Sequence, residues 1–333
     1  MKTKQKRIIT TWLYAGLLLI ALMVIIGGIT RLTHSGLSMV EWKLIGGAIP
    51  PLNDIQWQET FSNYQQFPEY QKINKGMSLS EFKSIFFWEY LHRLLGRLIG
   101  IVFIIPFIIF WTKKWFDKQQ KKQLFILLGF GALQGFLGWF MVKSGLMDVP
   151  AVSHYRLAIH LSVAFGIMCY IYWLILSFNA VEKSPNKSIN TLSKWLITAL
   201  VIQIIYGAFV AGLKAGYLLP QNGSFFESVF GYTLRDANDF SLLNNGFDIQ
   251  AFHRLFAWII FAIVFIIFNK TRKTTLAPAA LIVLGLTLTQ ITFGILTLLL
   301  KIQIHTATAH QFIAIVLLLS VVRLTYLSTE KTQ

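Results

Sequence analysis

The sequence predicts an all-α polytopic membrane protein, in which eight transmembrane helices form two parallel four-helix-bundle repeats and both termini are cytoplasmic. Of the 333 residues, 55% are hydrophobic and 13% are charged, with a mean hydropathy of +0.59. Soluble domains contain roughly 25% charged residues, so this composition excludes an ordinary soluble protein. About 20 consecutive apolar residues span a bilayer as a helix. Eight such stretches occur, at roughly Ile8–Ile29, Phe86–Trp111, Gln123–Val142, Tyr155–Phe178, Leu192–Leu213, Ile249–Phe268, Leu276–Leu300 and Thr306–Leu327.

The placement of basic residues predicts the orientation, because cytoplasmic loops carry an excess of Lys and Arg. Basic residues cluster at 2–7, 113–122, 183–194 and 270–273, which are the amino terminus and the connections after every second helix. The other connections mix basic and acidic residues. Both termini are therefore expected in the cytoplasm. The net charge of +16 is explained by basic residues in the cytoplasmic connections, so it does not indicate a nucleic-acid-binding surface.

The amino terminus also has some features of a secretory signal, since basic residues precede an apolar run. That run is long for a signal peptide and no small-x-small cleavage site follows it, so a retained first helix is expected. No Arg- and Ser-rich transit peptide is visible, which favours a bacterial cytoplasmic membrane. Cys169 is the one cysteine. An intrachain disulfide and a cysteine zinc cluster are thereby excluded, and Cys169 is interpreted as a small buried hydrophobe.

A repeated four-helix pattern divides the chain into a first half, residues 1–180, and a second half, residues 181–333. Four matches in register carry the repeat: His92 with His253, His160 with His310, Gln134 and Gly138 with Gln290 and Gly294, and Gly27 and Gly36 with Gly207 and Gly216. With four helices each, both halves begin and end on the cytoplasmic side, so the repeats are parallel.

Two outer segments differ in character. The segment from Thr30 to Ile85 is too long for a plain connection, and Pro50 and Pro51 interrupt any single helix. Its aromatic residues predict short interfacial helices that form a lid over the first half. The segment from Tyr217 to Asp248 is rich in Gly and Asn and is expected to be its less structured counterpart.

Four of the seven histidines are expected at a similar depth below the outer face, within about two turns of the start of an inward-running helix. Ionisable groups are costly there and are functional candidates by default. An ordinary interhelical hydrogen bond is the alternative for any single one. Paired inward-facing imidazoles in a four-helix bundle suit the axial positions of haem iron. Zinc is less suitable, because no thiolate or carboxylate completes a site in the second half. The proposed ligands are His92, His160, His253 and His310; His34, His154 and His305 are assigned interfacial roles.

The two halves differ beside the proposed ligands. Glu89 lies three residues before His92 and shares its helix face, whereas Gln250 takes that position before His253. A carboxylate can accept a proton or stabilise positive charge, so the first half is predicted to do the chemistry and the second to transfer electrons. The alternative for Glu89 is an ion pair with Arg93 at i+4.

Several arginines lie near the predicted outer face, although basic residues are normally concentrated on the cytoplasmic side. Arg93 and Arg254 directly follow a proposed ligand, and Arg97 lies one turn further along. Guanidinium groups bind carboxylates bidentately, so haem propionates are one expected partner. Lipid headgroups, reached by long side chains that extend to the interface, are the other.

Longer motifs resemble the haem A synthase family over essentially the whole chain. They are "GGITRLTHSGLSMVEWKLIGGAIPP" from Gly27, the E-x-x-H-R block "EYLHRLLGR" from Glu89, "FHR" from Phe252 and "TATAHQ" from Thr306. The resemblance implies oxidation of a ring methyl of haem O to a formyl group by successive hydroxylations, giving haem A. It also implies these roles: His92 and His160 ligate the substrate haem, Glu89 is the catalytic acidic residue beside it, and His253 and His310 ligate a haem B that relays electrons.

The resemblance further implies haem O synthase and the assembly of haem–copper oxidase as partners, and it leaves a homo-oligomer open. Some relatives carry cysteine pairs in their outer loops and this chain has none. Two other functions share the paired histidines: a non-catalytic dihaem protein of the cytochrome b type, and a haem carrier for oxidase assembly. The dihaem protein would not require the difference between Glu89 and Gln250 or the long outer segment.

Overall fold

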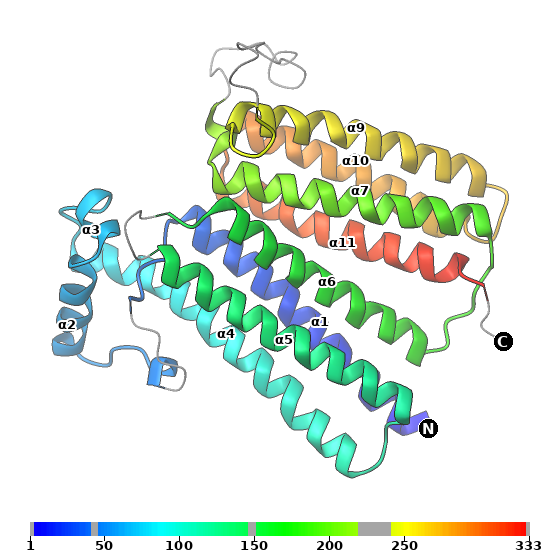
Figure 1. Cartoon of the computed structure of the whole chain (residues 1–333), viewed down its shortest axis with the longest axis horizontal. Helices are drawn as coiled ribbons and strands as arrows, with labels where there is room; N and C mark the ends of the chain where they lie inside the picture. The colour runs from blue at the N-terminus through cyan, green and yellow to red at the C-terminus, as the bar shows by residue number, and fades with distance from the viewer. Residues whose placement is uncertain (1–2, 41–45, 146–150, 219–240, 331–333) are drawn as a thin grey trace. The chain divides into compact units, whose positions relative to one another are not determined.

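The computed structural model describes residues 3–40, 46–145, 151–218 and 241–330, and within them it contains helices and no β-strand (Figure 1). Eight helices are long and apolar enough to cross a membrane, which confirms the predicted fold class. They are α1 (Thr3–Leu32), α4 (Leu79–Thr112), α5 (Lys118–Gly145), α6 (His154–Phe178), α7 (Lys187–Gly212), α9 (Gly246–Thr271), α10 (Ala277–Leu299) and α11 (Ile304–Ser328). The repeat arrangement and the cytoplasmic placement of the termini stay predictions.

The helices extend beyond the apolar runs where a polar side chain caps them. Helix α4 begins at Leu79, seven residues before the predicted start at Phe86, because Ser78 and Glu81 form a capping box. The Ser78 hydroxyl accepts from the Glu81 N–H, and the Glu81 carboxylate accepts from the Ser78 N–H at 2.8 Å. At the start of helix α7, the Asn186 side chain accepts a single cap bond from the Ile189 N–H at 3.1 Å. Both helices therefore begin with a polar first turn, several residues before the apolar run that the sequence predicts.

The outer segment contains the predicted short helices, η1 (Gly46–Ala48), α2 (Asp54–Gln65) and α3 (Pro68–Lys72). Helix α2 begins after Pro51, where the Asn53 side chain accepts from the Gln56 N–H. Aromatic side chains of α2 pack on the first turns of α4, and the buried residues of this cluster are Phe61, Tyr64, Phe82 and Phe86. The segment thus forms a packed cap on the start of α4. Residues 41–45, which include Trp42, and residues 219–240 of the later segment lie outside the described residues.

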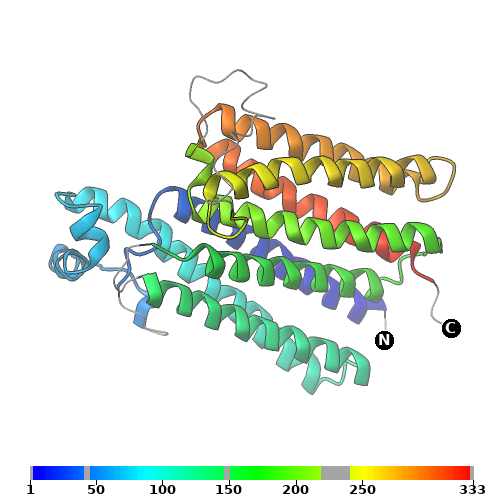
Figure 2. The ribbon, with the colours of Figure 1, turned by 45° about the horizontal axis from the view of Figure 1, so that its top comes forward.

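The chain forms two compact units. The first contains residues 15–156, and the second contains residues 2–14 and 157–333. In the second compact unit, α7, α9, α10 and α11 form a four-helix bundle in which α9 and α11 each pack against both α7 and α10 (Figures 1 and 2). Helices α9 and α11 are therefore diagonal corners of the bundle. Cys169 lies half-buried on α6. The assignment of one haem site to residues 1–180 and another to 181–333 stays a prediction.

Candidate functional site

The two histidines predicted as ligands in the second half come from the diagonal helices of the bundle. His253 lies on α9 and His310 on α11, and both side chains are half-buried. The two imidazoles are close enough to interact electrostatically. A bundle presents such diagonal side chains to a common interior.

Each of these imidazoles lies against a Gln-x-x-x-Gly turn of a neighbouring helix. A Cβ atom added to Gly207 of α7 would lie 3.1 Å from His253 Cε1, and one added to Gly294 of α10 would lie 3.0 Å from His310 Cε1. One turn earlier, the side-chain amide nitrogen of Gln203 lies 3.5 Å from His253 Nε2, and that of Gln290 lies 3.3 Å from His310 Nε2. An added Cβ would be closer to the ring than an ordinary van der Waals contact, so glycine favours this approach of helix backbone to ring.

The same glycine contact occurs in the first compact unit. A Cβ atom added to Gly27 of α1 would lie 2.9 Å from Cε1 of His92, which belongs to α4. Three of the four predicted ligands therefore lie against a glycine of another helix, and two of these glycines, Gly27 and Gly207, correspond in the proposed repeat. This shared packing supports the duplication.

The hydrogen bond at His310 determines which ring nitrogen carries the proton. Nδ1 of His310 lies 3.1 Å from the backbone carbonyl oxygen of Gln290. Because a carbonyl oxygen only accepts, Nδ1 carries the hydrogen in the neutral ring and Nε2 keeps its lone pair. An imidazole in this tautomer, oriented through its other nitrogen, is suited to bind a metal through Nε2.

The interior of the second bundle fits a haem. Its donor set is two imidazoles on opposite corners, and one of them, His310, is held with its hydrogen on Nδ1 and its Nε2 lone pair available. Several buried polar atoms there have no hydrogen-bond partner among the described residues: Gln203 Oε1, Gln250 Nε2, His253 Nδ1, Gln290 Oε1 and Thr308 Oγ1. Buried polar groups in native proteins are normally satisfied, so these atoms are consistent with a bound group that is not part of the chain.

The Gly294 contact gives a direct test with a matched control on the same helix. We expect Gly294→Ala to weaken haem B binding about tenfold, because the ring is held by Gln290 and cannot move away from the new methyl group. Gly285→Ala, where the added Cβ has no atom within 4 Å, should leave binding unchanged. Titration of both purified variants with haem B, followed by absorption, measures the difference. Equal affinities would contradict the close packing of the ring.

In the first compact unit, the end of α1 directs the chain back toward α4. His34 has a positive φ of 54°. The Ser35 N–H donates to the Thr30 carbonyl and the His34 N–H to that of Arg31, which is the Schellman pattern of a helix end. Thr30 Oγ1 also lies 3.3 Å from the Trp88 carbonyl oxygen on α4. His34 thus ends a helix, and the turn brings the following residues to Glu89.

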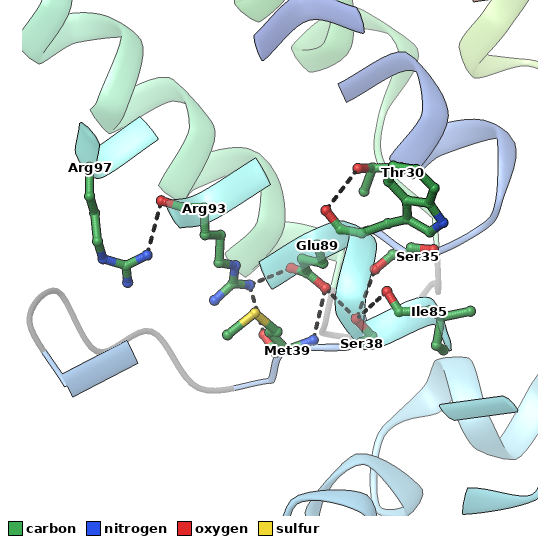
Figure 3. Close-up of polar contacts among 9 residues, drawn as sticks. Thr30, Ser35, Ser38, Met39, Ile85, Glu89, Arg93 and Arg97 are labelled. Carbon is green, nitrogen blue, oxygen red and sulfur yellow. Dashed lines mark hydrogen bonds and ion pairs between the residues drawn. The ribbon is translucent and has the colours of Figure 1, made fainter. Parts of the chain in front are cut away.

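The carboxylate of Glu89 is held by three donors from two segments (Figure 3). Oε2 accepts from the Ser38 hydroxyl and from the Met39 N–H, both at 2.8 Å. Oε1 accepts from the Arg93 guanidinium at 2.5 Å, and the same guanidinium donates to the Met39 carbonyl at 2.7 Å. Glu89 is 2% exposed and Arg93 is 8% exposed. The ion pair considered from the sequence is therefore present, and it is part of a larger buried network.

The other predicted site residues lie as follows. Arg97 donates to the backbone carbonyl of Arg93 at 3.0 Å, and Arg254 follows His253 on α9. Their role with propionates stays a prediction, as does that of Arg93. His160 lies half-buried on α6 in the second compact unit, whereas His92 belongs to the first. Their pairing also stays a prediction.

Gln250, the counterpart of Glu89, is buried at 2% exposure on α9. Sequence reasoning missed its neighbour Asp248, a carboxylate that is 4% exposed and accepts from the Ser241 N–H at 2.8 Å. It also missed Ser38, Gln203 and the buried Glu69 of α3. The one available signal was the Gln-x-x-x-Gly spacing at Gln203, which repeats that of Gln290.

Comparison with known proteins agrees with these observations. Residues 10–322 match the family described as cytochrome oxidase assembly protein. Heme A synthase of Flavobacterium johnsoniae is 43% identical over 96% of both chains. The protein of that name from Flavobacterium psychrophilum is 42% identical over 95% of this chain and 96% of its own. The one from Brucella anthropi is 37% identical over 95% of this chain and 90% of its own. The family predicted from the sequence motifs is thereby confirmed, and this chain belongs to the haem A synthase family of oxidoreductases.

Proposed function

We propose that this chain oxidises a ring methyl group of haem O to a formyl group by successive hydroxylations, in a bacterial cytoplasmic membrane with its haem sites near the outer face. The name shared by the relatives supports haem A synthesis. The difference between Glu89 and Gln250 supports placing the chemistry in the first half. One half has a buried, fully positioned carboxylate three residues before its histidine, and the other has a neutral amide there.

In the first half, some residues bind the substrate haem and another accepts protons. His92 and His160 ligate the iron of the substrate. Balanced with water as the oxygen source, conversion of a methyl to a formyl group is a four-electron oxidation that releases one proton for each electron passed on. A carboxylate has about four lone-pair positions, and three of those of Glu89 are used by Ser38, Met39 and Arg93. The remaining position, on Oε1, accepts a proton or faces developing positive charge.

In the second half, His253 and His310 would hold haem B. When bound, haem B supplies one-electron transfer and carries electrons away from the substrate. The chain's own residues prepare that site: Gln290 fixes the tautomer of His310, and Gly207 and Gly294 set the position of the two rings. Arg254 and the outer arginines Arg93 and Arg97 are the candidates for binding propionates. Haem O synthase and the oxidase under assembly are the proposed partners.

The proposal is tested by the haem content of membranes. We expect membranes that contain this chain and a haem O source to yield haem A, identified by mass after extraction, and membranes without the chain to yield haem O alone. If haem O persists unchanged while haem B is bound, the chain is an electron-transfer protein or a haem carrier and the proposed reaction is wrong.

A further inference from the structure

The second bundle places one side-chain amide beside each proposed haem B ligand. Gln203 lies on α7 and Gln290 on α10, which are the two corners of the bundle between α9 and α11. The amide nitrogen of Gln203 lies 3.5 Å from Nε2 of His253, and that of Gln290 lies 3.3 Å from Nε2 of His310. An imidazole that carries its hydrogen on Nδ1 binds a metal through Nε2. Each amide nitrogen is therefore next to the atom that would bind the iron.

The hydrogen bonds determine which end of each amide faces its imidazole. The side-chain amide of Gln203 donates to the backbone carbonyl of His253 at 2.8 Å, where an amide oxygen would face another acceptor. The ring of His310 uses Nδ1 to donate to the backbone carbonyl of Gln290 at 3.1 Å, so its Nε2 only accepts. Both glutamines therefore direct N–H groups toward the imidazoles. Their Oε1 atoms are buried and have no hydrogen-bond partner among the described residues.

The same distances limit how far the amides lie from the iron. A bond between a metal and an imidazole nitrogen is about 2.0–2.1 Å long. An amide nitrogen 3.3 or 3.5 Å from Nε2 is therefore at most about 5.6 Å from a metal bound there, whatever the angle. One amide accompanies each ligand, because His253 and His310 come from opposite corners of the bundle.

A hydrogen-bond donor this close to the iron favours the reduced form of a haem. The reduced form carries one more electron, and the positive end of an N–H group stabilises that charge. In the bundle interior this interaction is screened less than it would be in water. The charged residues of α9 near His253 are the buried Asp248 and Arg254. Changes to the glutamines leave both charges in place, so the contribution of the amides can be measured separately.

We propose that Gln203 and Gln290 are positioning residues that raise the reduction potential of haem B, through N–H groups directed at its two axial imidazoles. The proposal rests on the proposed function, because it requires haem B between His253 and His310. A haem that carries electrons away from the substrate must first accept them, and a higher potential favours that step. The two glutamines therefore favour electron flow out of the first half.

Redox titration of the purified full-length protein, followed by the absorption of haem B, tests this role. Methionine is unbranched like glutamine but has no N–H group. Gln203→Met and Gln290→Met should each shift the equilibrium about tenfold toward the oxidised haem, which for one electron is a decrease of about 59 mV in midpoint potential. The double variant should show the sum, because the two amides act through different imidazoles. Thr289→Val, at an exposed position next to Gln290 on α10, is the matched control and should keep the wild-type potential.

The titration also separates this role from a structural one. If haem B binds more weakly to both single variants but its potential is unchanged, or if both lose haem B altogether, the glutamines only hold the imidazoles in place and the proposal is wrong. An increased potential in either variant would contradict the direction of the N–H groups. A wild type that binds no low-spin haem B would refute the haem B site of the proposed function, and this inference with it. Haem B bound at the wild-type potential in every variant refutes this inference alone.

Discussion

Membranes that contain the Glu89→Gln variant are expected to accumulate haem O and to form at least about 100-fold less haem A than the wild type. A positioned general acid or base contributes about 10²–10⁴ to a rate. Glutamine keeps the size of the side chain but can neither take up a proton nor balance positive charge. It reproduces in the first half the amide that the second half carries at Gln250. The measurement is the ratio of haem A to haem O after extraction, by mass.

The ion pair between Glu89 and Arg93 requires a second variant. Removing one partner of a buried pair costs about 3–5 kcal/mol, because the other charge is left without compensation. Glu89→Gln combined with Arg93→Gln removes both charges and should restore thermal stability without restoring haem A. Ser38→Ala removes one of the three donors to Glu89, and a smaller decrease of about tenfold is expected. The haem B absorption of the second half reports whether each variant is folded.

Haem A at the wild-type level in either glutamine variant would contradict a chemical role. Glu89 would then serve only to hold Ser38, Met39 and Arg93 together, which is the structural role that its ion pair allows. Loss of haem A formation in both variants, with haem B still bound, would show that Glu89 acts in the reaction and not only in folding.

The transmembrane helices could be predicted because their length and composition are sufficient to identify them. The residues at which these helices begin could not be predicted in the same way. The first turns of α4 are polar, and the Ser78 and Glu81 capping box that starts the helix lies before the apolar run. The short helices of the outer segment were predicted from its prolines and aromatic residues. The aromatic cluster that packs Tyr64 on Phe82 depends on tertiary contacts, which no local pattern records.

The candidate site was predictable in its residue types but not in its connections. The repeat identified His253, Glu89 and the glycines, because residues at corresponding positions of the two halves can be compared directly. It gave no sign that Gly207 touches an imidazole. Glu89 is bound by Ser38 and Met39, which lie 51 and 50 residues earlier in the chain. No periodicity relates a helix to a loop at that separation, so the network required the structure.

The His253→Ala variant is expected to lose the low-spin absorption of haem B and to retain haem O in the first half. Loss of an outer-shell partner alone weakens metal binding about 10–100-fold, so loss of an axial ligand should weaken haem B binding at least about 100-fold. Haem A formation should also stop, because electrons then have no route away from the substrate. Absorption spectra of the purified protein and the mass of its extracted haems measure both effects.

The ligand assignment can be separated from general damage to the bundle. The vacated space beside Gly207 has room for a free imidazole, since the lost ring is what packs there. Added imidazole should therefore restore the low-spin spectrum of His253→Ala, which a misfolded bundle would not allow. His305→Ala, at an exposed position one residue into α11, is the matched control and should bind haem B normally. Retention of the low-spin spectrum in His253→Ala would refute the ligand assignment. Loss of haem O together with haem B would instead contradict the division of labour, because the first half would then depend on the second for binding its substrate.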